Sequence, residues 1–410
     1  MKVQRAGDDR LGGGPGFGDG RILDKARRKR RQTFRAAAAL VAGAGIAVAT
    51  AGIGSASPVA PRAEHAQKAV TATMAYELAH AGELNTTSFC GTKPITLGVL
   101  DGLGVNAWSQ FSMAAVRSEA AKCKNVKQVV EIADGSLQTA ISQINSLATQ
   151  GVNAATVIPD FGPAELPAIE SAYRAGVKIV PWGANPGGKN GVDYVSYVDW
   201  VPNYSGKLLG SWMAKVLHGK GNVIELGGPA GNPVSADLLA GVVSSLKSYP
   251  GIKLLTGTKT WAVTNWDPAT AQQVVASLLA KYPVINGIIA DYGTDELSAL
   301  HAFQAAGRRF PDVAGADANG LGCLWQQSQG TKNAFQLATV STRNWLGRVA
   351  ARKAIAAAEG IKDTEPNLYD LGFYENSAGG VRPHCDPGRP AASYLSDFLS
   401  AAAIAKWGKP

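Results

Sequence analysis

Short apolar segments alternate with helical segments along most of the chain, and this alternation constrains the fold more than any other feature. From about residue 94 to 359, strand-like apolar runs alternate with helix-like stretches of about ten to fifteen residues. Such a pattern is typical of βαβ units, whose parallel strands are covered by helices on both faces. About ten strands are too many for one doubly wound domain, so we predict an α/β fold with two Rossmann-like lobes and parallel sheets.

The predicted elements cover most of this region. The strands are 95–100, 126–132, 154–158, 177–182, 194–198, 223–226, 252–255, 287–290, 313–316 and 335–340. The helices are 109–122, 137–150, 164–175, 204–217, 236–248, 268–281, a segment that ends at 306, and 345–359. Ligands bind beyond the carboxyl ends of the strands in such sheets, so the residues that follow each strand are the candidates for a site.

Positive charge is concentrated at the N-terminus. Residues 1–35 contain eleven Lys or Arg and four Asp or Glu, which leaves a net charge of only +2 for the rest of a chain whose total is +9. A nucleic-acid-binding protein would spread positive charge over its folded surface. The charge distribution therefore argues against nucleic acid as a partner.

An apolar stretch from Ala36 to about Ile53 follows this basic run. A basic segment, an apolar segment and small residues in that order predict a secretory signal. The alternative is an uncleaved anchor, because about 18 apolar residues can just span a bilayer. We assign residues 1–56 to a signal segment or membrane anchor and expect an extracytoplasmic location, in the periplasm or at the cell surface. Residues 57–91 are predicted to be a tether, with some helix around 63–81.

Asn106 and Trp108 follow the first predicted strand. Their side chains would face a cleft there, and the alternative is a helix cap with a core aromatic residue. The nearby Gly102 and Gly104 lack the G-x-G-x-x-G spacing of a dinucleotide site, and no acidic residue ends the second strand as such a site requires. We therefore expect no nucleotide cofactor.

Tryptophans recur near the ends of later strands. Trp182 ends one strand, and Asn185 lies in the glycine-rich loop after it. An aromatic residue there can form a cleft wall, and packing between lobes explains it equally well. Trp261 and Trp266 share a further loop, where Asp267 before a proline is a typical helix start. Helix capping does not explain two tryptophans in a loop, whereas an aromatic platform for a ligand does.

Carboxylates and a tyrosine follow two other strands. Asp291 and Tyr292 come directly after 287–290, and Asp317 comes directly after 313–316. A carboxylate at a strand end can accept charge-assisted hydrogen bonds from ligand hydroxyl groups. The alternative is N-capping of helices, which explains one of these carboxylates more easily than both.

Enzyme signatures are scarce in this chain. It contains no G-x-S-x-G, H-E-x-x-H or G-x-x-x-x-G-K-[ST] motif, and its five histidines are scattered without metal-ligand spacing. We therefore predict a binding protein and not an enzyme, with neither a cofactor nor a metal.

The order of these features resembles the periplasmic sugar-binding proteins of the ribose-binding type, which are ligand receptors of ABC importers. The segments that carry the resemblance are Asn106-Ala107-Trp108, Val223–Gly228, Ile289–Asp291 with 295–300, and Gly315-Ala316-Asp317. The resemblance implies a type I periplasmic binding protein fold, with a three-crossover hinge that closes the lobes over a ligand. It implies crossings near Asp199, Thr342 and Asn367, lobe one at 92–199 plus 342–366, lobe two at 200–341, and a C-terminal crossover and closing segment at 367–410. In that last segment we expect a closing strand and a helix near 393–406.

The resemblance also implies ligand contacts. Matched position by position, these fall at Asn106, Trp108, Trp266, Tyr292 and Asp317, and the strand-end argument adds Trp182, Asn185 and Asp291. Gly183-Ala184 stand where the family often has an Asp-Arg pair, and Ser235–Leu239 lacks an arginine often found there. A pocket that loses two arginines and gains tryptophan would be less polar, which leaves room for a polyol, a deoxy sugar or an aromatic metabolite.

The four cysteines are Cys90, Cys123, Cys323 and Cys385. An even number in an exported protein permits disulfides, and four cysteines allow three pairings. A helix that returns antiparallel to its strand brings the residue before the strand close to the end of the helix. We therefore predict a disulfide between Cys90 and Cys123 and, by elimination, one between Cys323 and Cys385.

These observations together predict an extracytoplasmic solute-binding protein of an ABC importer. We expect a monomer that binds a sugar or sugar-like molecule between its lobes and docks on a membrane permease. One alternative is a ligand-sensing protein for a signalling receptor, and another is a binder of a more apolar or aromatic metabolite. A repressor is excluded because a signal segment stands where a helix-turn-helix would be.

Overall fold

The computed structural model describes residues 70–72, 86–104 and 106–409. The chain divides into two units, residues 1–62 and 63–410, and every described residue belongs to the second unit. The predicted signal segment or anchor lies outside the described residues. Within the described part of the chain, no helix combines the length and the apolar character needed to span a bilayer.

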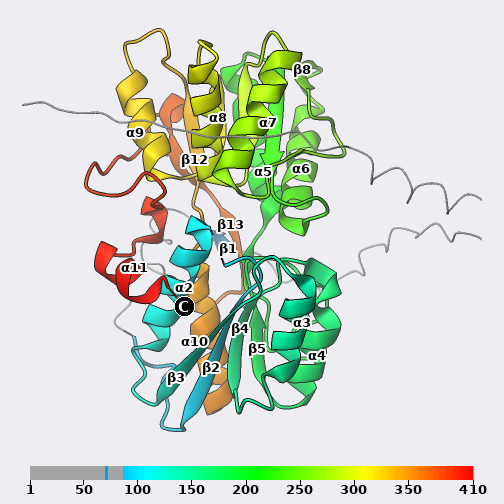
Figure 1. Cartoon of the computed structure of the whole chain (residues 1–410), viewed down its shortest axis with the longest axis vertical. Coiled ribbons are helices and arrows are strands. Elements are labelled where there is room, and N and C mark those ends of the chain that lie inside the picture. Colours follow the sequence, from blue (N-terminus) through cyan, green and yellow to red (C-terminus); the bar gives the residue numbers. More distant parts are fainter. Residues whose placement is uncertain (1–69, 73–85, 105, 410) are drawn as a thin grey trace, which may run out of the picture. The chain divides into compact units, whose positions relative to one another are not determined.

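A four-stranded parallel sheet forms the centre of one lobe (Figure 1). In sheet order its strands are β3 (Val126–Ile132), β2 (Ile95–Asp101), β4 (Ala154–Ile158) and β5 (Lys178–Pro181). The helices of this lobe are α2 (Ala107–Ala120), α3 (Leu137–Ser146), α4 (Leu166–Arg174) and α10 (Leu346–Glu359). Helix α10 comes from far along the chain and packs against β4, β5 and α2.

A second sheet forms the centre of the other lobe. Its strands are β14 (Phe373–Asn376), β12 (Leu337–Val340), β11 (Asp312–Ala316), β10 (Gly287–Ala290), β7 (Lys220–Gly227) and β8 (Gly251–Leu254), with β9 (Ala262–Val263) beside β7. Only β14 runs antiparallel to its neighbour. The helices of this lobe are α5 (Pro202–Val216), α6 (Pro233–Leu246), α7 (Pro268–Lys281), α8 (Gly293–Ala305) and α9 (Asn319–Ser328).

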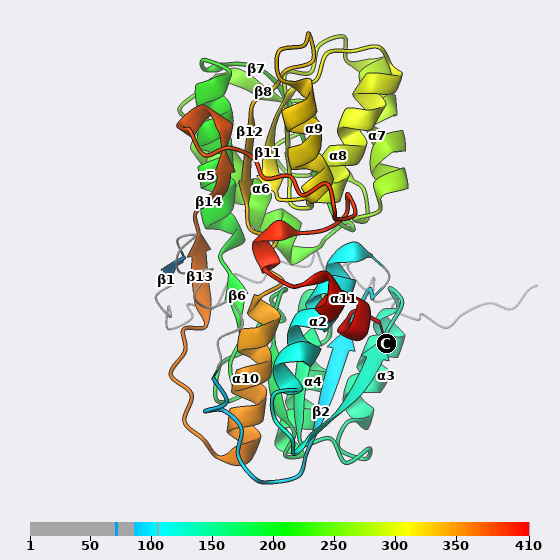
Figure 2. The same cartoon turned by 90° about the vertical axis from the view of Figure 1, so that its left-hand side faces the viewer.

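A small parallel sheet lies between the two lobes (Figure 2). It consists of β1 (Val70–Ala72), β13 (Leu368–Leu371) and β6 (Asp199–Trp200). Two of the three predicted crossings, near Asp199 and Asn367, adjoin these strands. Strand β1 lies in the segment where we expected some helix, so this expectation is wrong for 70–72. Pairing with β13 decides the conformation there, and such pairing overrides local helical composition.

The other differences from the predicted elements are local. The segment 194–198 is not a strand, because only single bridges, such as that between Trp182 and Val198, connect it to its neighbours. No strand was predicted at β9 and no helix at α9. For 367–410 the prediction was a crossover, a closing strand and a helix near 393–406, and the structure has β13, β14 and a helix at Ala401–Trp407 there. The bounds of these two strands could not be predicted, because β13 and β14 pair with partners distant in sequence and no local pattern marks them.

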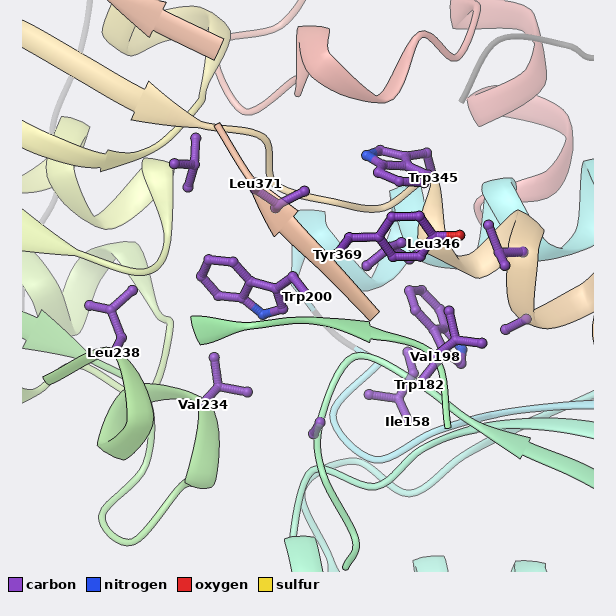
Figure 3. Packing of buried hydrophobic residues seen from close by; sticks show 14 of the residues in the cluster. Ile158, Trp182, Val198, Trp200, Val234, Leu238, Trp345, Leu346, Tyr369 and Leu371 are labelled. Carbon is purple, nitrogen blue, oxygen red and sulfur yellow. The ribbon is translucent and has the colours of Figure 1, made fainter. Parts of the chain in front are cut away.

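Aromatic residues pack tightly where the lobes join (Figure 3). Trp182, Trp200, Trp345 and Tyr369 are all buried in one core cluster. The rings of Trp345 and Tyr369 meet edge to face, with their centroids 5.1 Å apart, a favourable arrangement for aromatic pairs.

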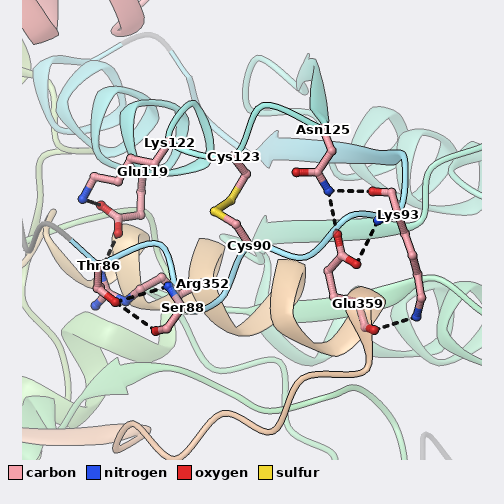
Figure 4. Close-up of a disulfide and its surroundings, with 10 residues drawn as sticks. All are labelled: Thr86, Ser88, Cys90, Lys93, Glu119, Lys122, Cys123, Asn125, Arg352 and Glu359. Carbon is pink, nitrogen blue, oxygen red and sulfur yellow. Dashed lines mark hydrogen bonds and ion pairs between the residues drawn. A yellow bond between two sulfur atoms is a disulfide. The ribbon is translucent and has the colours of Figure 1, made fainter.

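Both predicted disulfides are confirmed by the structure. Cys90 bonds to Cys123, and Cys323 bonds to Cys385. Beside the first disulfide, the Glu359 carboxylate accepts hydrogen bonds from Lys93 N (3.1 Å) and Asn125 Nδ2 (2.6 Å) (Figure 4). These contacts hold the entry to β2 against the end of α10. Two helices from distant parts of the sequence are joined nearby, because Arg352 of α10 pairs with Glu119 of α2 at 3.0 Å.

The last segment of the chain follows β14 and contains little regular structure. The 3-10 turns Ser377–Gly379 and Leu395–Asp397 and helix α11 (Ala401–Trp407) belong to this last segment. It runs from the lobe of α9 to the side of α2 (Figure 2).

Candidate functional site

A cavity opens between the lobes, at the carboxyl ends of the strands. It is lined by Leu103, Asn106, Trp108, Ser109, Asp160 and Gly183 from the lobe of β2, by Val234, Trp266, Asp291 and Tyr292 from the lobe of β7, and by Arg343. The space left between these side chains is about 30 Å³, which is room for a water molecule or two. A hydrogen bond of 3.3 Å from Asn232 Nδ2 to the Asp160 carbonyl oxygen joins the lobes beside the cavity.

Trp108 forms one wall of the cavity. Asn106 caps α2, because its Oδ1 accepts a hydrogen bond from Ser109 N at 2.9 Å, and this cap fixes the start of the helix that carries Trp108. The indole Nε1 of Trp108 donates to the Thr342 carbonyl oxygen at 2.9 Å. Its ring lies against Gly183, where an added Cβ would come within 3.2 Å of Cη2. Both of the alternatives raised for Asn106 and Trp108, capping and cleft lining, therefore apply together.

Trp266 forms a second wall, on the other lobe. Its ring lies over Gly228, and a Cβ there would come within 2.4 Å of ring atom Cε2. The backbone of Asn265 and Trp266 is left-handed, with φ of 57° and 53°. Consecutive non-glycine residues in this region are uncommon and strained. Asp267 caps α7 as predicted, by accepting from Thr270 N at 2.7 Å, and so holds the loop in place.

Asp291 is buried beneath the cavity and holds the Trp266 wall. Its Oδ1 accepts from Trp266 Nε1 at 2.8 Å, and its Oδ2 accepts from Ser235 Oγ at 2.5 Å. Burial raises the pKa of the Asp291 carboxyl, while these two hydrogen bonds act in the opposite direction. The next residue, Tyr292, also lines the cavity and precedes α8.

Asp160 and Asp101 place a pair of carboxyl groups on the other lobe. Among the described residues, Oδ2 of each has no hydrogen-bond partner, whereas Asp101 Oδ1 accepts from Leu103 N (3.0 Å) and Gly104 N (2.6 Å). Burial, and then the nearby Asp101 and Glu165 carboxylates, raise the pKa of Asp160 well above its usual value. The backbone N–H groups of Gly102 and Leu103 lie beside this carboxyl and lower its pKa, and Asp160 also lines the cavity.

Arg343 enters the cavity from the link between β12 and α10. Its side chain is 5% exposed, and its guanidinium carbon lies 4.2 Å from the centroid of the Trp200 ring and 5.7 Å from that of Trp108. The two positions where an arginine was expected to be missing, at 183–184 and 235–239, indeed have none, but Arg343 brings a cation to the cavity from a third position. The cavity contains a buried cation beside two tryptophans.

Three predicted ligand contacts do not line the cavity. Trp182 is 1% exposed and lies behind Trp108, with ring centroids 5.7 Å apart, so it packs in the core and not on the cleft wall. Asn185 Oδ1 accepts from Gly187 N at 2.8 Å within its own loop. Both carboxylate oxygens of Asp317 are engaged inside the protein, by Thr342 and Ser396. The remaining five predicted residues, Asn106, Trp108, Trp266, Asp291 and Tyr292, are brought together around the cavity.

Asp160 and Arg343 are the chemically important residues that the sequence analysis missed. Asp160 lies two residues after β4, and Arg343 lies three residues after β12. Both positions satisfy the strand-end criterion that selected the other candidates. Among the described residues, no group of three or more His, Cys, Asp or Glu side chains is arranged to hold a metal ion.

A family model described as a periplasmic binding protein domain matches residues 99–362. This match covers more than half of the chain and includes most of the strands of both large sheets and all of the residues that line the cavity. The chain belongs to the periplasmic binding protein family. It therefore shares its two-lobed fold with proteins that bind small molecules in a cleft, as the sequence resemblance indicated.

Curated relatives of this periplasmic binding protein match part of its length. The xylitol-binding protein of Mycolicibacterium smegmatis is 28% identical over 220 residues, which are 52% of this chain and 61% of the relative. The galactofuranose-binding protein YtfQ of Escherichia coli is 28% identical over 165 residues, which are 40% of this chain and 51% of the relative. The match thus spans between half and two thirds of each relative.

Solved structures share the fold of this binding protein. One is the fructose-binding periplasmic domain of a hybrid two-component system, with a TM-score of 0.60 and 20% identity over 70% of this chain and 92% of that one. Another is a galactofuranose-binding protein, with a TM-score of 0.59 and 20% identity over 68% of this chain and 94% of that one.

Proposed function

We propose that this protein is an extracytoplasmic solute-binding protein of an ABC importer that binds a neutral sugar or polyol between its lobes. The observation that carries the proposal is the cavity, where the faces of Trp108, Trp266 and Tyr292 stand beside hydrogen-bonding groups. Aromatic faces suit the C–H surfaces of a sugar, and carboxyl groups accept the protons of its hydroxyl groups. The ligands named for the two curated relatives, xylitol and galactofuranose, support this class.

The proposed ligand contacts are the five predicted residues around the cavity. Trp108 and Trp266 stack on the ligand, and Asp291 and Tyr292 form its polar floor. Asn106 uses its Oδ1 as the helix cap, so its Nδ2 is the group that faces a ligand. Trp182, Asn185 and Asp317 are left out, because they do not line the cavity.

Binding requires a change in the distance between the lobes. A space of about 30 Å³ does not admit a sugar, so the ligand enters when the lobes separate and is enclosed when they close. The closed form then docks on a membrane permease, and the ligand leaves chemically unchanged. Two disulfides support an oxidising, extracytoplasmic location. A monomeric state stays a prediction.

A thermal-shift panel of the protein with its disulfides formed tests this proposal. The panel contains sugars, polyols, nucleosides, amino acids and aromatic acids. A ligand at 100 times its dissociation constant adds about 2.7 kcal/mol to the free energy of unfolding, which raises Tm by a few degrees. We expect hits among sugars or polyols. Hits confined to aromatic or other apolar compounds would overturn the proposed ligand class.

Substitution of the two cavity tryptophans tests the site. We expect Trp108→Ala and Trp266→Ala each to weaken binding about tenfold or more, equivalent to about 1.4 kcal/mol. The matched control is Trp325→Ala in α9, which removes a partly buried tryptophan that does not line this cavity. Equal affinities in all three variants would contradict the assignment of the cavity as the binding site.

A further inference from the structure

Arg343 is a buried cation whose donors lack acceptors. It is 5% exposed, and neither Nε nor Nη1 finds a hydrogen-bond partner among the described residues. An arginine keeps its charge in a protein, and leaving a buried charged donor unsatisfied costs several kcal/mol, on the order of 2–5. Buried polar groups are nearly always hydrogen-bonded, so an exception beside a cavity points to a partner that enters the cavity.

The acidic neighbours of Arg343 are already engaged elsewhere. Both oxygens of Asp291 accept hydrogen bonds, from Trp266 and Ser235. Asp199 accepts from the Tyr197 hydroxyl and from Trp200 N. No ion pair within 4.0 Å joins Arg343 to any described acidic residue. The two carboxylates act on the guanidinium only at longer range and leave its N–H groups available.

The backbone at Arg343 is strained in the same way as at Trp266. Its φ is 63°, in the left-handed region that non-glycine residues rarely adopt. The turn is held from both sides, because Arg343 N donates to Ser341 Oγ at 3.0 Å and Leu346 N donates to the Arg343 carbonyl oxygen at 2.9 Å. Strained residues that the surrounding structure holds in place cluster at ligand sites. Here two such residues line one cavity.

We propose that Arg343 donates hydrogen bonds from its guanidinium to oxygen atoms of the ligand and so restricts the ligand class to neutral polyhydroxylated compounds. This inference rests on the proposed function and makes it more specific. According to this inference, Arg343 is the residue that discriminates between a ligand and its deoxy or cationic analogues.

The unpartnered groups of the cavity complement a hydroxylated ligand. Arg343 offers donors, and Asp160 Oδ2 on the facing lobe has no partner among the described residues. A hydroxyl group can accept a hydrogen bond from the first and donate one to the second. A ligand carboxylate would accept from Arg343 but would stand near the Asp291 carboxyl, both of whose oxygens are hydrogen-bond acceptors. The cavity therefore favours neutral oxygen-rich compounds over acids.

Arg343 also changes what the rest of the cavity would select. Trp108, Trp266 and Tyr292 beside Asp291 would attract a cation, since aromatic faces and carboxylates together recognise quaternary ammonium groups. The positive charge of Arg343 in the same cavity opposes such ligands. Replacing it by an apolar residue should weaken polyol binding and reduce the discrimination against cations.

The test compares affinity ratios in the full chain by titration calorimetry. The probes are xylitol, D-xylose, D-fructose and choline, with each monodeoxy analogue of the tightest binder among the first three. The variants are Arg343→Met, Arg343→Gln, which keeps two N–H donors, and Arg343→Lys, which keeps the charge. The control is Arg382→Met, which removes an exposed arginine that does not line this cavity.

In the wild type we expect at least one monodeoxy analogue to bind about 100-fold more weakly than its parent, because a site built to hydrogen-bond a hydroxyl group rejects the analogue that lacks it. In Arg343→Met the affinities of the parent ligand and this analogue should differ by no more than about threefold, because the hydroxyl group no longer has the arginine as its partner. Arg343→Gln should keep part of the ratio, and Arg382→Met should keep all of it.

The possible failures are distinguishable. If the wild type binds none of the sugars and polyols, the proposed function and this inference both fall. If the wild type binds one of them and Arg343→Met keeps the wild-type ratio, only this inference falls. A purely structural role for Arg343 would lower Tm and weaken all probes in proportion, which also overturns it. If Arg343→Met does not fold, the same affinity ratio is measured in Arg343→Gln and Arg343→Lys. A ratio equal to that of the wild type in both variants overturns the inference.

Discussion

A buried charged residue at the junction of the lobes can either stabilise the fold or bind the ligand, and its hydrogen-bond partners show which. Asp317 Oδ1 accepts hydrogen bonds from Thr342 N (2.8 Å), Thr342 Oγ1 (2.9 Å) and Ser396 Oγ (2.6 Å), and Oδ2 accepts from Ser396 N (3.1 Å). These contacts join the end of β11, the link after β12 and the C-terminal segment. Asp317 is therefore a structural residue at a position where the family resemblance implied a ligand contact.

Asp317→Ala should lower the free energy of unfolding by about 3 kcal/mol, because it leaves several buried donors of Thr342 and Ser396 without their acceptor. Chemical denaturation measures this change. The affinity for the best ligand, measured well below the unfolding transition, should change little. A large loss of affinity with unchanged stability would restore Asp317 as a ligand contact.

Buried carboxyl groups should also make the protein less stable as pH rises. Burial raises the pKa of Asp295 to about 8 and that of Asp199 to about 7. The unfolded chain loses these protons near pH 4, whereas the folded protein keeps them, so stability declines from about pH 4 through about pH 8. Tm should therefore be a few degrees lower at pH 8.5 than at pH 5.5.

Asp295→Asn should reduce this difference in Tm, since its amide cannot ionise and can still accept the hydrogen bond from Thr264. The exposed Asp134→Asn is the control. An unchanged pH dependence in Asp295→Asn would show that this group does not titrate as described.

Loops at strand ends place the aromatic walls, and glycines make room for them. Gly228 follows β7 and lies under the Trp266 ring, and Trp261 Nε1 donates to the Gly228 carbonyl oxygen at 2.8 Å. The backbone N–H of Gly228 donates a hydrogen bond to Ser235 Oγ at 3.0 Å. The loop is thus fitted between two tryptophans, which explains why a side chain is absent at this position.

Gly228→Ala should displace the Trp266 ring, because its Cβ would lie within 2.4 Å of a ring atom. We expect ligand affinity to fall about tenfold, with a loss of stability of about 1–3 kcal/mol from the overpacking. Calorimetric titration and thermal unfolding measure the two effects. The control is Gly388→Ala, at an exposed position. An unaffected affinity would contradict a role for Trp266 in the cavity wall.

At the scale of the whole molecule, the C-terminal segment connects the two lobes. It is attached to α9 by the Cys323–Cys385 disulfide, and the Nδ2 of Asn319 lies within hydrogen-bond distance of three of its carbonyl oxygens. It ends in α11, which packs against α2 of the other lobe, where Arg117 Nη1 donates to the Trp407 carbonyl oxygen at 3.1 Å. Any motion of the lobes must therefore extend or release this segment.

Removing the disulfide by Cys323→Ser with Cys385→Ser should lower stability by roughly 4 kcal/mol, because the bond closes a loop with a sequence separation of 62 residues. Hydrogen exchange across 386–400 should also become faster. The matched control is Cys90→Ser with Cys123→Ser, whose disulfide spans a separation of 33 residues. It should cost a similar amount of stability and leave the exchange of 386–400 unchanged. Unchanged exchange in both variants would contradict the anchoring role.

Local patterns in the sequence were enough to predict most of the helices and strands in their order. Apolar runs and helical periodicity are local properties, so β3, β4, β10 and α7 have the predicted bounds. The Cys90–Cys123 pairing followed from the antiparallel return of a helix, which is also a short-range property. The five strand-end residues around the cavity were predictable because parallel strands bring their carboxyl ends to one edge.

The packing of the complete lobes selects which of the strand-end residues face the cavity. Trp182 and Trp108 both follow strands of the same sheet, but α10 and the core cover the first and leave the second on the cleft. Asp317 is engaged by Ser396, which lies 79 positions away in the sequence, and Arg343 reaches the cavity through a left-handed turn. Contacts between distant segments and strained turns leave no periodic signal, because they depend on how complete lobes pack together.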